Sequence, residues 1–78
     1  MAHMDLGDVL FNLGQPAKAA QEYLSEIRLN PDFEMTRLHL AIAYEATGLK
    51  DRAVEQYRIV ARRNPANQQV QTALERLK

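Results

Sequence analysis

The sequence predicts an all-α fold built from helical hairpins, and three features of the chain support this expectation. Several residues recur 34 positions apart, a period that is typical of stacked repeat architectures. Glycine and proline divide the chain at regular places, and the apolar residues between these breaks follow helical spacing. We therefore expect a solenoid of two repeats and a C-terminal capping helix, five helices in all. The recurring pairs are Leu6 and Leu40, Gly14 and Gly48, Ala19 and Ala53, Tyr23 and Tyr57, Arg28 and Arg62, and Pro31 and Pro65.

The breaks set the expected ends of the helices. Gly14 and Gly48 can adopt the left-handed conformation that ends a helix, and Pro16 suits the first turn of the next one. Asn30 and Asn64 each precede a proline, which pushes the residue before it out of the helical conformation. Because the connections are short, neighbouring helices should run antiparallel. The expected helices lie near residues 4–13, 16–30, 33–47, 50–63 and 66–77.

Each expected segment has an apolar stripe at helical spacing, and none alternates as a strand does. The last segment is otherwise polar, which suits a terminal repeat that has no further neighbour to cover it. In chain order, the stripes are Leu6, Leu10 and Leu13, then Ala20, Leu24 and Ile27, then Leu40, Ala43 and Tyr44, then Ala53, Tyr57 and Val60, and finally Val70, Ala73, Leu74 and Leu77.

These residues resemble the tetratricopeptide repeat (TPR) family, whose 34-residue unit is a helix A, a turn and a helix B. The resemblance covers nearly the whole chain and keeps its register in both units. It divides the chain into a first unit at 5–32, a second unit at 33–65 and a capping helix at 66–78, preceded at 1–4 by a segment that looks like a cloning remnant. The matching positions are Leu6, Gly7, Gly14, Ala19, Tyr23 and Pro31 in the first unit, and Leu40, Ala41, Tyr44, Gly48, Ala53, Tyr57 and Pro65 in the second.

The resemblance implies structural roles for these positions. The small residues should let two helices approach closely, and Tyr23 and Tyr57 should fill the gap between repeats with hydroxyls that stay in water. Glu26 stands where the family has a small residue, and a buried carboxylate is costly unless it is paired. We therefore expect Arg28 or another cation near Glu26, a rotated helix, or a more open face.

Composition excludes several classes of partner. Ten basic and ten acidic residues give no net charge, which argues against nucleic acid or an anionic membrane surface as the main partner. No apolar run approaches the roughly 20 residues that cross a bilayer, so we expect no membrane insertion. The chain has no cysteine and hence no disulfide framework. Together with the lack of a visible signal peptide, this favours a cytoplasmic location.

No group of residues indicates catalysis, and we expect neither an enzyme nor a cofactor or metal site. The chain has no glycine-rich phosphate loop and no nucleophile motif. His39 is a lone helical histidine. The position four residues later is Ala43, so the local pair that commonly binds a metal is missing.

In the family that the chain resembles, the A helices line a concave groove that binds a partner. The resemblance places seven residues there. The apolar ones form either one exposed patch, which would mark an interaction site, or part of the core. The positions of the family's carboxylate clamp hold no lysine or arginine, and Asp8 would repel an acidic tail, so a chaperone-tail clamp is not expected. The groove residues are Asp8, Phe11, Asn12, Met35, Leu38, Ile42 and Glu45.

The expected function is a protein–protein interaction scaffold that binds a partner peptide or helix in the groove or associates with itself. The alternative is a regulatory or oligomerisation segment of a larger enzyme whose catalytic domain lies elsewhere. Residues 1–34 hold two basic and six acidic residues, and residues 35–78 hold eight basic and four acidic ones. This opposite charge could favour a homodimer or weaker oligomer. The contact should involve the first helix, with its apolar surface near Val9, Leu10 and Phe11, or the groove residues Phe11, Leu38 and Ile42.

Overall fold

The computed structural model describes the backbone of residues 3–78 and the side chains of residues 5–78. These residues form five α-helices and no strand, which confirms the all-α prediction. Residues 1–2 of the expected cloning remnant lie outside the described part of the chain. The helices are α1 (His3–Asn12), α2 (Pro16–Leu29), α3 (Glu34–Ala46), α4 (Lys50–Arg63) and α5 (Gln68–Arg76).

Local chemistry explains most of the observed helix ends. Gly14 and Gly48 adopt φ angles of +80° and +79° just after α1 and α3, where a side chain would be strained. The helix α5 begins at Gln68 and not at 66, because the Asn67 side chain accepts a hydrogen bond of 3.2 Å from the backbone N–H of Val70 and so caps the helix. The bounds of α2 and α4 are 34 residues apart at both ends.

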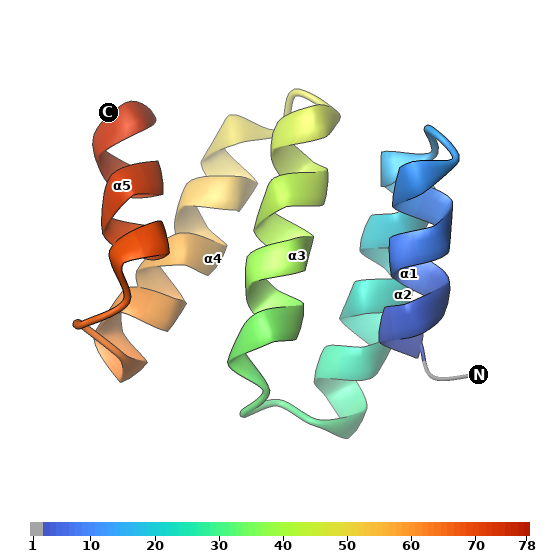
Figure 1. Ribbon diagram of the computed structural model, residues 1–78, viewed down its shortest axis with the longest axis horizontal. Coiled ribbons are helices and arrows are strands. Elements are labelled where there is room, and N and C mark those ends of the chain that lie inside the picture. The colour runs from blue at the N-terminus through green and yellow to red at the C-terminus, as the bar shows by residue number, and fades with distance from the viewer. Residues whose placement is uncertain (1–2) are drawn as a thin grey trace.

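The helices form two layers (Figure 1). The helices α1, α3 and α5 lie in front in this view, and α2 and α4 lie behind them, with consecutive helices running in opposite directions. Each helix packs mainly against its neighbours in sequence, and α1 also touches α3. This arrangement gathers three helices from different parts of the chain on one face.

The core lies between the layers. Ala19, Ala41 and Ala53 are fully buried, in agreement with the expected close approach of helices. Tyr23 is 2 % exposed, and its ring occupies the space that a side chain at Gly7 would need. A Cβ atom at Gly7 would lie 2.5 Å from Cε1 of that ring. Gly7 therefore accommodates a tyrosine ring.

The partner of Glu26 is not the expected cation. Glu26 is 8 % exposed and accepts a hydrogen bond from the side-chain amide of Asn30. Arg28 instead donates to the hydroxyl of Ser25 at 3.2 Å on the exposed side of α2. Asn30 is the residue just after α2 and lies about one turn from Glu26. Its neutral side-chain amide therefore satisfies the buried carboxylate locally.

Several acidic residues of the first half also have partners inside the chain. Asp32 pairs with Arg63 at 3.2 Å, and Glu34 accepts hydrogen bonds from the side chains of Asn64 and Asn67. These contacts join the α2–α3 connection and the first residue of α3 to the last residue of α4 and the α4–α5 connection. One of these contacts, between Asp32 and Arg63, pairs opposite charges of the two halves, whereas the partners of Glu34 are neutral amides.

Candidate partner-binding groove

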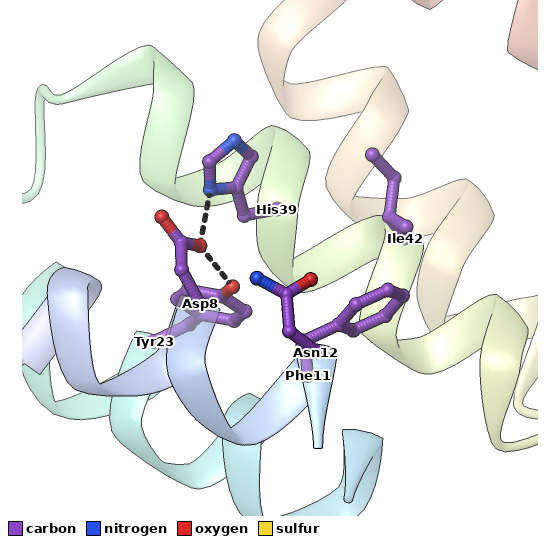
Figure 2. A pocket seen from close by; sticks show the side chains of 6 residues that line it. All are labelled: Asp8, Phe11, Asn12, Tyr23, His39 and Ile42. Carbon is purple, nitrogen blue, oxygen red and sulfur yellow. Dashed lines mark hydrogen bonds and ion pairs between the residues drawn. The ribbon is translucent and has the colours of Figure 1, made fainter. Parts of the chain in front are cut away.

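Two neighbouring pockets lie on the face formed by α1, α3 and α5, and we call them together the groove. The first pocket encloses about 270 Å³ between α1 and α3. The second encloses about 630 Å³ between α3 and α5, and both share the half-buried side chain of Ile42. Figure 2 shows the residues of the first pocket, which are Asp8, Phe11, Asn12, Tyr23, His39 and Ile42. The second is lined by Ile42, Glu45, Tyr57, Gln68, Gln69, Thr72, Ala73 and Arg76.

Five of the seven predicted groove residues line these pockets. They are Asp8, Phe11, Asn12, Ile42 and Glu45.

The other two predicted residues lie elsewhere. Leu38 is only 7 % exposed and belongs to the core, so its place in the groove is wrong. Ile42 lies about one turn further along α3, is half-buried and lines both pockets. Met35 is 50 % exposed but lines neither pocket. The alternative of one exposed apolar patch formed by Phe11, Met35, Leu38 and Ile42 is therefore wrong, because Leu38 is buried.

The first pocket contains a buried tyrosine that is bonded to a carboxylate. The hydroxyl of Tyr23 donates to Oδ1 of Asp8. Burial and this hydrogen bond raise the pKa of Tyr23 above its usual range. His39, from α3, brings Nδ1 to 3.0 Å from the same Oδ1. The rings of Tyr23 and His39 meet edge to face with centroids 5.7 Å apart (Figure 2).

The second pocket contains a similar group. The hydroxyl of Tyr57 donates to Oε2 of Glu45 at 2.5 Å. Arg76, from α5, donates to Oε1 at 2.6 Å and to Oε2 at 3.2 Å, which forms a two-pronged contact. The hydrogen bonds from Arg76 lower the pKa of Glu45, and the bond from Tyr57 adds to this effect against the opposing effect of burial.

The two groups are related by the repeat with a small shift. The tyrosines are 34 residues apart. Asp8 and Glu45, like His39 and Arg76, are 37 apart, which is one repeat plus about one helical turn. Each group thus joins three consecutive helices through a tyrosine, a carboxylate and a basic side chain. Sequence reasoning missed these groups because it compared only positions in identical register.

The groove combines apolar and polar side chains. Among the described residues, no group of three or more His, Cys, Asp or Glu could hold a metal ion. Phe11 and Ile42 give partly exposed apolar walls, and the exposed side chains of Asn12 and Gln69 can hydrogen-bond to a peptide backbone.

No helix among the described residues is both long and apolar enough to cross a bilayer. No family model matches the chain, and no curated protein matches its sequence. The resemblance to the TPR family therefore rests on the residues quoted from the sequence alone.

Proposed function

We propose that this chain is a TPR module that binds a peptide segment of a partner protein along the groove. The observation that carries the proposal is the pair of adjoining pockets on one face, lined mainly by side chains of α1, α3 and α5. Binding sites typically combine apolar walls with a few placed polar groups. Phe11 and Ile42 supply the walls, and Asn12, Gln69 and Thr72 supply polar groups.

The side-chain contacts that link the helices of the groove also support the proposal. The contacts of Asp8 with Tyr23 and His39 link α1 to α2 and α3. Those of Glu45 with Tyr57 and Arg76 link α3 to α4 and α5. A surface that is held in place before binding loses less conformational entropy when the ligand arrives. A short peptide, which makes few contacts, needs such an advantage to bind measurably.

Selection from a random peptide library tests the proposal. The wild-type protein should enrich a defined set of peptides, and Ile42→Lys should bind them about tenfold or more weakly, because it places a charge between the two pockets. The matched control is Leu24→Lys, which changes a 39 % exposed residue of α2 on the other layer. Equal binding by both variants, at unchanged helicity, would remove the groove as the binding site.

A further inference from the structure

We infer that the first pocket receives a basic side chain of the bound peptide, arginine above all, with its cation against Asp8. This inference rests on the proposed peptide binding and adds the chemistry of the residue that is recognised. It is carried by the comparison of the two related tyrosine–carboxylate groups, one of which already holds an arginine.

The second pocket shows how this fold places a guanidinium. There Arg76 contacts both oxygens of Glu45, while Tyr57 donates to one of them. The carboxylate is thereby neutralised by a group that keeps its charge at all ordinary pH values. The chain thus contains an internal example of a cation that sits on a tyrosine-bound carboxylate.

The carboxylate of the first pocket is not satisfied to the same extent. Oδ1 of Asp8 meets both the Tyr23 hydroxyl and His39, whereas no described residue donates a hydrogen bond to Oδ2. Nδ1 of His39 is close but is not aligned as a hydrogen bond. The Asp8 side chain is 41 % exposed and lines a pocket of about 270 Å³. The Asp8 carboxylate is therefore partly exposed, and its Oδ2 has no hydrogen-bond donor among the described residues.

The other walls of the pocket suit the stem of a basic side chain. Asp8 and His39 are the two lining residues that carry or can carry full charge, and Asp8 would repel an anion. Phe11 and Ile42 offer apolar surface to the methylene groups of arginine or lysine. Arginine fits best, because its planar guanidinium can contact two oxygens of a carboxylate at once.

The test uses a peptide selected on the wild-type protein and the same peptide with arginine replaced by citrulline, which is neutral and similar in shape. Loss of the charge should weaken binding to the wild type about tenfold or more. It should change binding to Asp8→Asn less than about twofold, because the charged acceptor is gone. The asparagine keeps an oxygen for the Tyr23 hydroxyl. Asp5→Asn, on the exposed part of α1, is the matched control and should behave as the wild type does.

The outcomes separate this inference from the proposed function. If no peptide is enriched, peptide binding itself fails. If peptides bind and depend on Ile42 but show no basic preference, or if citrulline weakens Asp8→Asn and the wild type equally, the cation site is refuted and peptide binding stands. A readout without any variant is the NMR signal of the Asp8 carboxyl carbon. It should shift with the arginine peptide and not with the citrulline peptide, and equal responses would also overturn the inference.

Discussion

Replacing Gly7 with alanine should destabilise the protein, although helix propensity alone predicts the opposite. In an exposed helix, this change stabilises by about 0.8–1 kcal/mol. Here the new Cβ would lie 2.5 Å from Cε1 and 2.9 Å from Cδ1 of the Tyr23 ring. That ring is 2 % exposed and its hydroxyl is bonded to Asp8, so it cannot swing away freely.

The expected size follows from these two opposing effects. Overpacking of a buried site costs typically 1–3 kcal/mol, and a contact far inside normal carbon–carbon separation belongs in the upper half of that range. After the gain in propensity is subtracted, the net loss is about 1–2 kcal/mol. The residue 34 positions later is alanine, so a substitution guided by the repeat alone would be chosen as an improvement.

Urea unfolding followed by circular dichroism measures this effect. The midpoint of Gly7→Ala should fall by about 1 M, given a slope of about 1–2 kcal/mol per molar urea for a domain of this size. The variant Gly7→Ala with Tyr23→Leu serves as a control, because a smaller side chain should remove part of the clash. An unchanged or higher midpoint for Gly7→Ala would show that the ring of Tyr23 does not occupy this space.

Three further predictions follow from particular contacts. Leu38→Glu should lower helicity and cost about 3 kcal/mol or more, because it buries a carboxylate in the core, and a fully folded variant in circular dichroism would contradict the assignment of Leu38 to the core. The pKa of Glu45 is lower in the folded protein than its ordinary value of 4.5. Its carboxylate therefore stabilises the fold at pH values above 4.5, and this contribution is lost as the pH falls through the folded pKa. The urea stability of Arg76→Met should therefore fall less between pH 6 and pH 3 than that of the wild type, and equal falls would refute this. Val9 of α1 and Leu13, the residue just after α1, are 42 % and 67 % exposed. Sedimentation equilibrium should therefore show weak self-association that Leu13→Glu abolishes, and a single monomer mass at every wild-type concentration would exclude it.

The secondary structure could be predicted because its causes are local. The helices follow from apolar spacing, and their ends follow from Gly14, Gly48 and the prolines, which act on the few residues around them. The start of α5 was missed by two residues because the cap formed by Asn67 depends on one side-chain hydrogen bond. Such a bond competes with several similar ones that a sequence also allows.

The candidate site could be predicted only in part, because it depends on how helices are rotated against one another. Five of the seven predicted groove residues line the two pockets, while Leu38 is buried in the core and Met35 lines neither pocket. The bonds of Tyr23 and Tyr57 to carboxylates follow from positions one turn out of register, so an exact repeat comparison could not find them. Val9 is exposed as predicted, whereas Leu10 and Phe11 are partly buried against the core.

The most direct test of peptide binding in the groove is an NMR titration of the isotopically labelled protein with a selected peptide. We expect the largest shifts of backbone amide signals in α1, α3 and α5, around Phe11, Ile42 and Thr72. Signals of the back layer, α2 and α4, should change little. Shifts confined to α2 and α4, or to the outer face of α1 around Val9 and Leu13, would contradict it.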